Sequence, residues 1–268
     1  MSSSVMIQIT DLQKSFGTKQ VLRGLNLEVA RGESLVILGG SGSGKSVLLK
    51  HLIGLLRPTS GSVVVDGVDI HTLDRNDLTE FRRRYGMSFQ EGALFDSMTV
   101  GDNVGFPLMR RRPRPAQEDI DERVAACLSL VGLDGTADKL PSELSGGMRR
   151  RVGFARSIVL EPEILLFDEP TTGLDPIMTA VIDEIIQNMK RELGCTTITI
   201  THDLQSAFRI ADRIAMLHRG QILAVADADR FRDLEDPRIR QFLDGRAHGP
   251  MSEDILAPHG SSTTADSR

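Results

Sequence analysis

A glycine-rich loop that follows a buried apolar strand constrains the fold of this chain more than any other feature. Residues 34–38 read Ser-Leu-Val-Ile-Leu, a short apolar run that predicts a buried strand. The pattern G-x4-G-K-[S/T] comes next, with the residues Gly39, Gly40, Ser41, Gly42, Ser43, Gly44, Lys45 and Ser46, and then Val47. Glycines let the backbone curl so that its N–H groups point at phosphate oxygens. We therefore expect a strand, a phosphate-binding loop and a helix over about 45–56.

Two side chains of this loop have predicted roles of their own. Lys45 is expected to reach the β- and γ-phosphates of a nucleotide, and the Ser46 hydroxyl to bind Mg²⁺. The N-terminus of the following helix favours anions. The alternative is a flexible glycine turn, but residue frequencies give such a chance match a probability of about one in a hundred in a chain of 268 residues.

A second apolar strand ends in two acidic residues. Residues 163–168 read Glu-Ile-Leu-Leu-Phe-Asp, and Glu169 follows. A buried strand delivers Asp168 to its carboxyl end, where it can hold Mg²⁺ directly or through water. Glu169 is then free to orient or deprotonate the attacking water. Taken by itself, the pair of acids is also explained by a solvated turn, because acidic side chains are usually exposed. The presence of the phosphate-binding loop in the same chain favours the catalytic interpretation.

Strand-like and helix-length segments alternate, which is typical of an α/β domain with a largely parallel sheet. Further strands are expected over 5–10, 25–29, 62–66, 196–201 and 213–217, and helices over 118–131 and 177–193. Residues 109–116 are rich in Arg and Pro and predict an exposed connector. We expect one domain over 5–245 and a flexible polar tail over 246–268. No internal repeat occurs in the sequence, so each chain carries one such loop.

The composition narrows the class of protein. A 40% apolar fraction supports a real core, and a net charge of -5 argues against nucleic acid as the main partner, because nucleic acid favours a basic face. Cys127 and Cys195 match no metal-ligand spacing and suit a reducing compartment. We expect no signal peptide in the first ten residues, and no apolar run approaches the ~20 residues of a membrane helix. Any membrane association is therefore expected to be peripheral.

Several motifs, in a fixed order, resemble those of ABC ATPases. Residues 144–148 read Leu-Ser-Gly-Gly-Met and resemble the signature motif of that family, with Met where Gln is commoner. Gln90 is similar to the Q-loop glutamine, and residues 173–175 resemble the D-loop. His202 resembles the switch histidine, and Phe16 stands where the family places an aromatic residue, more often Tyr, under the adenine. The resemblance covers about residues 5–245.

This resemblance implies a P-loop NTPase of the ABC-ATPase fold, with a RecA-like core, an N-terminal antiparallel β subdomain and a helical signature subdomain over about 91–160. It implies ATP and Mg²⁺ as cofactors. The catalytic residues implied are Glu169, His202 and Gln90, and the metal ligands implied are Ser46, Gln90 and Asp168. Nucleotide contacts are implied for Phe16, residues 39–47, Ser145, Gly146, Gly147 and Asp175.

The resemblance also implies that the chain works as a pair. In this family the signature helix faces away from its own P-loop, so Ser145 and Gly147 are expected to contact the γ-phosphate held by a second copy. Each residue also has a structural explanation when taken alone. His202 fits a satisfied histidine at a strand end, Gln90 a surface amide, and Phe16 a core residue. Their shared order favours the functional interpretation.

Longer segments are similar to the ATPases of phospholipid ABC systems, the Mla and MCE transporters of bacterial envelopes. These segments are residues 39–50, 89–100 and 144–148. The similarity implies phospholipid transport between inner and outer membranes, from a peripheral position on the cytoplasmic face of the inner membrane. The partners implied are an integral permease, an MCE-domain lipid-binding protein and a STAS-domain subunit.

Other functions stay open. The chain can serve an ABC transporter with a different cargo, act on nucleic acid without transport, or switch on nucleotide binding with little hydrolysis. The basic clusters at 82–84, 109–114 and 149–151 are either solvated faces or contacts for partner acids or anionic headgroups. The tail is either a solvated end or a segment that wraps a neighbouring subunit.

Overall fold

A six-stranded sheet of order β10-β9-β3-β8-β7-β6 forms the centre of the computed structural model, which describes residues 4–88 and 92–252. Five of these strands run parallel: β3 (Ser34–Leu38), β6 (Tyr85–Ser88), β7 (Ile164–Asp168), β8 (Thr196–Thr201) and β9 (Arg213–His218). The edge strand β10 (Gln221–Asp227) pairs antiparallel with β9. The carboxyl ends of the parallel strands therefore meet at one edge, the usual ligand-binding edge of such a sheet.

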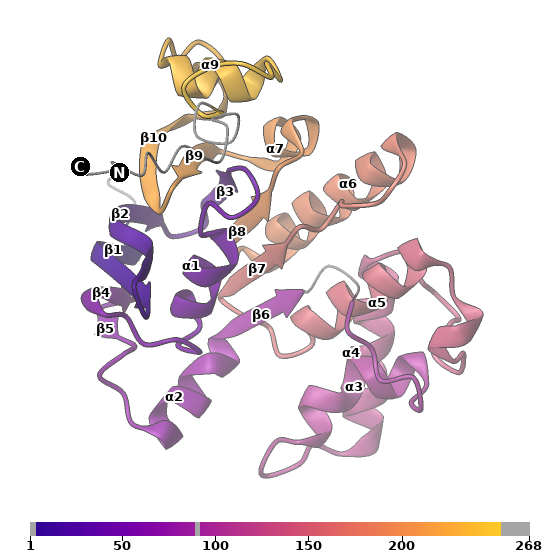
Figure 1. The fold of residues 1–268 in the computed structure, drawn as a ribbon. Helices are drawn as coiled ribbons and strands as arrows, with labels where there is room; N and C mark the ends of the chain where they lie inside the picture. The colour runs from indigo at the N-terminus through magenta and orange to yellow at the C-terminus, as the bar shows by residue number, and fades with distance from the viewer. Residues whose placement is uncertain (1–3, 89–91, 253–268) are drawn as a thin grey trace, which may run out of the picture.

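A second sheet, antiparallel and of order β2-β1-β4-β5, packs beside the first (Figure 1). Its strands are β1 (Val5–Phe16), β2 (Lys19–Ala30), β4 (Ser60–Val65) and β5 (Val68–Asp69). The strands expected over 5–10 and 25–29 are correct in place but too short, because β1 and β2 extend as a hairpin toward residues 17 and 18. The outer half of this hairpin is largely exposed, so its apolar pattern is weak.

Two apolar cores meet across the central sheet. In β3 all five residues are buried, and the four apolar ones alternate between the cores. Leu35 and Ile37 join the core shared with the antiparallel sheet and with helix α1 (Lys45–Leu52), whereas Val36 and Leu38 join the core under the other helices. A strand buried on both faces reads as a continuous apolar run, which is why the sequence reveals β3 so clearly.

The helical subdomain lies to one side of the central sheet (Figure 1). It is built from α3 (Val100–Met109), α4 (Gln117–Leu130), the short turn η2 (Pro141–Glu143) and α5 (Gly146–Ile158). The three long helices share one apolar core, and α5 also packs against β6. These helices fall within the predicted range of about 91–160, and the predicted Arg- and Pro-rich connector joins α3 to α4. Before them come α2 (Arg75–Phe81) and η1 (Arg82–Arg84).

The remaining helices follow the strands of the sheet: α6 (Pro176–Leu193), α7 (Leu204–Ile210), α8 (Ala228–Phe231) and α9 (Pro237–Leu243). The chain continues past residue 245 and folds back on α9. The Gln241 amide donates to the Arg246 carbonyl at 3.1 Å and to Ser252 Oγ at 2.9 Å, and its oxygen accepts from the Met251 N–H at 2.7 Å. Residues 246–252 of the predicted tail thus pack on the domain, and the rest of the tail lies outside the described residues.

An ion-pair network joins the two sheets at the ends of their strands. Arg84 donates to Glu163 at 2.7 and 2.8 Å and to Asp66 at 2.6 Å, and Arg31 contacts the same two acids. Hydrogen bonds from Arg84 are the main reason why the pKa values of both Asp66 and Glu163 are lowered. Asp66 belongs to the β4–β5 turn and Glu163 precedes β7, so this network fixes the antiparallel sheet to the core.

We predict that Arg84→Gln lowers the free energy of unfolding by about 1–2 kcal/mol at pH 7, because it removes charge-assisted bonds that are only partly exposed. A lowered carboxyl pKa stabilises the fold above the unfolded-state pKa of about 4 and loses this effect as the pH falls below it. As the pH is lowered from 5, the free energy of unfolding should therefore fall less steeply in the variant than in the wild type.

Urea denaturation at several pH values measures both effects. Arg83→Gln is the matched control, because within the described residues Arg83 forms an ion pair only with the exposed Glu80, one helical turn away. The Arg83–Glu80 pair is expected to contribute less than about 0.5 kcal/mol to the free energy of unfolding. Equal losses in the two variants, or an unchanged acid limb in Arg84→Gln, would contradict the assigned role of the network.

Candidate active site

The glycine-rich loop connects β3 to α1 at the carboxyl edge of the sheet. Gly42 and Gly44 have φ values of 75° and 111°, in the left-handed region that favours glycine. At Gly39 a Cβ atom would lie 2.4 Å from the Leu217 carbonyl oxygen, so β9 leaves no room for a side chain. The Gly220 N–H donates to the Ser43 carbonyl at 3.0 Å, and the β9–β10 turn thereby supports the loop from behind.

Lys45 starts α1 and folds its side chain back into the loop. Its Nζ donates to the Gly39 carbonyl at 2.6 Å and to the Gly40 carbonyl at 3.1 Å, and it lies 3.8 Å from Glu169 Oε1. Burial lowers the pKa of Lys45, and the charges of Glu169 and Asp168 oppose that shift. The loop therefore holds a partly desolvated cation, which a phosphate group can neutralise.

Asp168 and Glu169 stand at the end of β7, as the sequence predicts. Burial is the main cause of the raised pKa of Asp168, the charge of Glu169 adds to it, and Lys45 opposes it. Glu169 adopts a φ of 53°, an unusual value for a residue with a side chain, and its N–H donates to the Ile200 carbonyl at 2.9 Å. Two adjacent carboxylates in a half-buried position favour a bound cation.

His202 follows β8 and reaches the same carboxylate. Its Nδ1 lies 2.9 Å from Glu169 Oε2, which also accepts from Thr172 Oγ1 at 3.0 Å. The Glu169 side chain is 17% exposed and the His202 side chain 59% exposed, so the histidine covers the carboxylate from the solvent side. Residues that the sequence places 33 positions apart thus form one hydrogen-bonded pair.

A cavity of about 560 Å³ opens beside the loop, and its wall includes residues 41–47 and Glu169. Sequence reasoning missed the other lining residues, which are Lys19, Gln20, Val21, Arg23 and Arg219. They come from β2 and from the β9–β10 turn, and no local motif marks them. Phe16 ends β1 close to this part of the chain, with 47% of its surface exposed and Lys14 Nζ 5.2 Å from its ring centroid.

The signature segment lies at the start of α5, in the helical subdomain. Ser145 caps the helix, because its Oγ accepts from the Met148 N–H at 3.2 Å, and both Ser145 and Gly146 are exposed. Gly147 is buried against Met178, whose Cε would lie 2.8 Å from an added Cβ. Neither Ser145 nor Gly147 belongs to the wall of the cavity beside the loop.

Two hydrogen bonds connect the signature helix to the loop that follows Glu169. The Arg150 guanidinium donates to the Pro170 carbonyl at 2.8 Å and to the Thr172 carbonyl at 2.9 Å, and Arg150 is 7% exposed. Asp175 caps α6 by accepting from the N–H groups of Ile177 and Met178 at 2.9 and 3.0 Å. Gly146 and Gly173 line one pocket, so the predicted signature and D-loop segments lie together near the loop that carries Glu169.

The predicted metal ligands fit Mg²⁺ only with help from a nucleotide. Among the described residues no group of three or more His, Cys, Asp or Glu side chains is arranged to hold a metal ion. Ser46 and Asp168 offer hard oxygen ligands, and Mg²⁺ commonly takes its other ligands from water and from substrate phosphates. Gln90, the third predicted ligand, lies outside the described residues.

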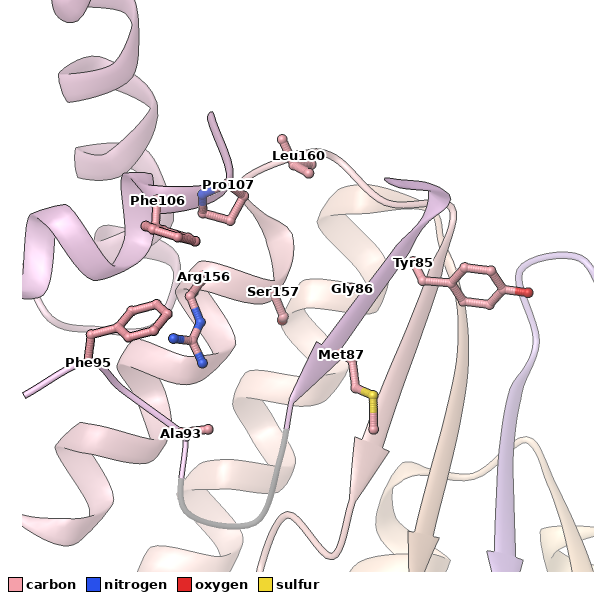
Figure 2. Close-up of a pocket in the computed structure, with 10 residues that line it drawn as sticks. All are labelled: Tyr85, Gly86, Met87, Ala93, Phe95, Phe106, Pro107, Arg156, Ser157 and Leu160. Atoms are coloured by element: carbon pink, nitrogen blue, oxygen red, sulfur yellow. The ribbon is translucent and has the colours of Figure 1, made fainter. Parts of the chain in front are cut away.

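A second cavity, of about 350 Å³, lies between β6 and the helical subdomain. Figure 2 shows Phe95, Phe106 and Arg156 clustered on one side of it, with Met87 of β6 across from them. The rings of Phe95 and Phe106 have centroids 4.9 Å apart, and the Arg156 guanidinium lies 5.8 Å from the Phe95 centroid.

In the described part of the chain no helix is long and apolar enough to cross a membrane.

Comparison with known proteins identifies the family. Residues 22–172 match the family model described as ABC transporter. The chain is 42% identical to "Probable ribonucleotide transport ATP-binding protein mkl" of Mycobacterium leprae, over 95% of this chain and 74% of that protein. It is 39% identical to "Intermembrane phospholipid transport system ATP-binding protein MlaF" of Escherichia coli K12, over 92% of this chain and 91% of that protein.

Solved structures agree with the predicted fold. The dimeric post-hydrolysis structure of the ATP-binding cassette MJ0796 with ADP and Pi has a TM-score of 0.76 and 32% identity, covering 83% of this chain and 99% of that one. CbiO1 of Clostridium perfringens has a TM-score of 0.79 and 30% identity, covering 90% of this chain and 99% of the other. The phosphate-binding loop, the paired acids and these matches lead to one conclusion: the chain belongs to the ABC transporter family and is one of its ATP-hydrolysing, ATP-binding subunits.

Proposed function

We propose that two copies of this chain power a transporter that moves phospholipid between the inner and outer membranes of a bacterium. The observation that carries this proposal is the match to MlaF, which spans 92% of this chain at 39% identity. The mycobacterial relatives are named for ribonucleotide transport instead, so a ribonucleotide cargo is the second candidate. Both candidates use the same ATP-driven subunit and differ in what the permease carries.

The geometry supports a role for each residue around the phosphates. The amides of residues 39–46 and the Lys45 ammonium bind the β- and γ-phosphates. Ser46 and Asp168, together with the predicted Gln90, would hold Mg²⁺, which would neutralise phosphate charge. Glu169 accepts a proton from the attacking water, and His202 holds the Glu169 carboxylate in place and donates to the γ-phosphate. Lys45 and His202 contact different oxygens of Glu169.

Pairing of two copies completes the site in this proposal. Ser145 and Gly146 are exposed at the N-terminus of α5, where unpaired N–H groups favour an anion. They lie outside the wall of the cavity in their own chain, so a nucleotide held by a second copy is their natural ligand. The MJ0796 cassette, to which the chain is similar, is described as dimeric and bound to ADP and Pi, which supports the pairing of two copies. Asp175 at the start of α6 would face the partner in the same interface.

We predict that Glu169→Gln binds ATP with nearly normal affinity but hydrolyses it about 10²–10⁴ times more slowly, because glutamine keeps the shape and loses the proton acceptor. Phosphate release and nucleotide binding measure the two effects separately. The matched control is Thr172→Val, which removes a hydrogen bond to the same carboxylate and should slow turnover by less than about tenfold. Normal turnover in Glu169→Gln would remove Glu169 from the role of base.

The cavity beside β6 is the proposed contact for the permease. Its aromatic wall suits a short helix with apolar side chains, and its lining includes Met87 and Ala93, which stand on either side of the predicted Q-loop glutamine in the sequence. That glutamine contacts both the nucleotide and the permease in this proposal. In this proposal the closed pair of chains binds ATP more tightly than the open pair, so ATP favours closure. Closure then moves the permease helix that is docked in the cavity. The further proposed partners are an MCE-domain lipid-binding protein and a STAS-domain subunit, with the chain peripheral on the cytoplasmic face.

We predict that the affinity-tagged chain co-purifies from its native membranes with a permease, an MCE-domain protein and bound phospholipid. Phe106→Ala should reduce recovery of the permease at least about tenfold, the effect of losing one well-buried aromatic contact at an interface. Basal ATP hydrolysis by the isolated variant should stay unchanged. The control is Leu140→Ala, an apolar residue of the helical subdomain that is 41% exposed.

Mass spectrometry identifies the partners and extracted lipids identify the cargo. A complex without phospholipid, whose ATP hydrolysis responds to ribonucleotides, would contradict the lipid assignment and favour the second candidate. Recovery of nucleic acid without a permease would contradict both candidates. Equal permease recovery with wild type and Phe106→Ala would remove the cavity from its assigned role.

A further inference from the structure

We propose that the arginine loop, defined as residues 110–114 between α3 and α4, binds the anionic headgroups of phospholipids at the membrane surface. It reads Arg-Arg-Arg-Pro-Arg, and each of its four arginines is exposed. Four like charges within five residues produce a strong local positive potential, although the whole chain has a net charge of -5. This contrast indicates a local anion-binding surface rather than a general property of the protein.

None of these arginines forms an ion pair with an acid within residues 4–88 and 92–252. Arg112 donates to the Arg111 carbonyl at 2.9 Å, and Arg114 donates to the Gln117 side-chain oxygen at 2.7 Å. Elsewhere in the chain arginines commonly have a carboxylate partner, for example Arg84 with Glu163 and Arg238 with Asp236. The charges of the arginine loop are therefore available to an external anion.

The place of the arginine loop in the fold points to the membrane. Helix α3 contributes Phe106 and Pro107 to the cavity beside β6 and ends at Met109, directly before the arginine loop. In Figure 1 the connection from α3 to α4 lies at the lower edge of the molecule, the same edge at which α2 lies. This step rests on the proposed function, in which the permease docks at that cavity, because a permease spans the bilayer and its docked segment brings the neighbouring arginine loop toward the membrane.

Acidic residues near the arginine loop set limits on its affinity. Helix α4 begins with an exposed acidic stretch, namely Glu118, Asp119, Asp121 and Glu122. Gln117, which accepts from Arg114, donates to Asp121 at 2.8 Å, so a neutral amide stands between the two charges. These acids reduce the field at a distance, and binding should therefore require close contact and weaken as salt rises.

The arrangement fits a flat lipid surface better than nucleic acid. The arginines occupy one short exposed loop, whereas nucleic-acid sites line a groove or a stripe with many basic residues. The acidic remainder of the chain would repel a long polyanion but can stay away from a planar membrane. Arginine also forms paired hydrogen bonds with phosphate groups, which suits a phospholipid headgroup.

Co-sedimentation of the purified full chain with vesicles tests the proposal. The vesicles contain phosphatidylcholine alone or phosphatidylcholine with phosphatidylglycerol, at low and at physiological salt. The wild type should bind the anionic vesicles and not the neutral ones. Each basic residue near such a surface strengthens binding by about fivefold. The variant Arg110→Gln, Arg111→Gln, Arg112→Gln, Arg114→Gln should then bind at least about twentyfold more weakly, if only two of the arginines reach the headgroups.

A matched variant controls for net charge. It carries four substitutions elsewhere in the chain: Arg191→Gln in α6, Arg230→Gln in α8, Arg232→Gln just after α8 and Arg246→Gln after α9. This control should bind like the wild type, and both variants should keep wild-type ATP hydrolysis, which verifies that they are folded. The vesicles need no permease, so the result is independent of the docking and cargo experiments.

Three results would overturn the proposal. The first is equal binding of the wild type to neutral and anionic vesicles, and the second is an equal loss of binding in the two variants. The third is loop-dependent binding to a homopolymer RNA without binding to anionic vesicles, which would assign the arginine loop to nucleic acid instead.

Discussion

The candidate active site depends on the carboxylate of Glu169, because side chains from three neighbouring strand ends meet there. Lys45 comes from the loop after β3, Glu169 from the end of β7, and His202 from the end of β8. Lys45 approaches one carboxylate oxygen at 3.8 Å and His202 the other at 2.9 Å. The parallel order β3-β8-β7 makes this meeting possible, since it aligns three carboxyl ends at one edge of the sheet. The phosphate-binding loop then places a cation where a nucleotide phosphate can replace the carboxylate as its partner.

A second set of contacts extends from Glu169 toward the helical subdomain. Arg150 of α5 donates to the carbonyl groups on either side of Thr171, shortly after Glu169 in the chain. Because Arg150 is nearly fully buried, a shift of α5 must also move this loop or break these bonds. The same helix presents Ser145 at its exposed N-terminus. A ligand at that N-terminus and the state of Glu169 are thus linked through one rigid helix.

The sequence predicts those parts of the structure that local patterns encode. Strands such as β3 and β7 are buried on both faces and therefore appear as apolar runs, and the loop after β3 has a spacing fixed by the geometry of phosphate binding. The ABC-ATPase fold and the family are confirmed by the comparisons. The length of the β1–β2 hairpin was underestimated, because its exposed end lacks an apolar pattern.

Other features depend on contacts between distant segments, which no local pattern records. Lys19, Arg23 and Arg219 line the nucleotide cavity because β2 and the β9–β10 turn converge on the loop. Residues 246–252 are held in part by the buried amide of Gln241, which contacts Arg246, Met251 and Ser252. The roles of Gln90 and of residues 253–268 stay predictions, because these residues lie outside the described part of the chain.

The central claim is that each ATP site contains the loop of one chain and the signature segment of another, and mixed pairs test it most directly. Chains with Lys45→Ala and chains with Ser145→Arg should each be inactive alone, since every site in either pair is defective. Mixing them creates pairs in which one site combines an intact Lys45 with an intact Ser145. ATP hydrolysis should then reappear, at up to about a quarter of the wild-type rate with random pairing. Full activity of either variant alone, or no activity in purified mixed pairs that bind ATP, would contradict the composite site.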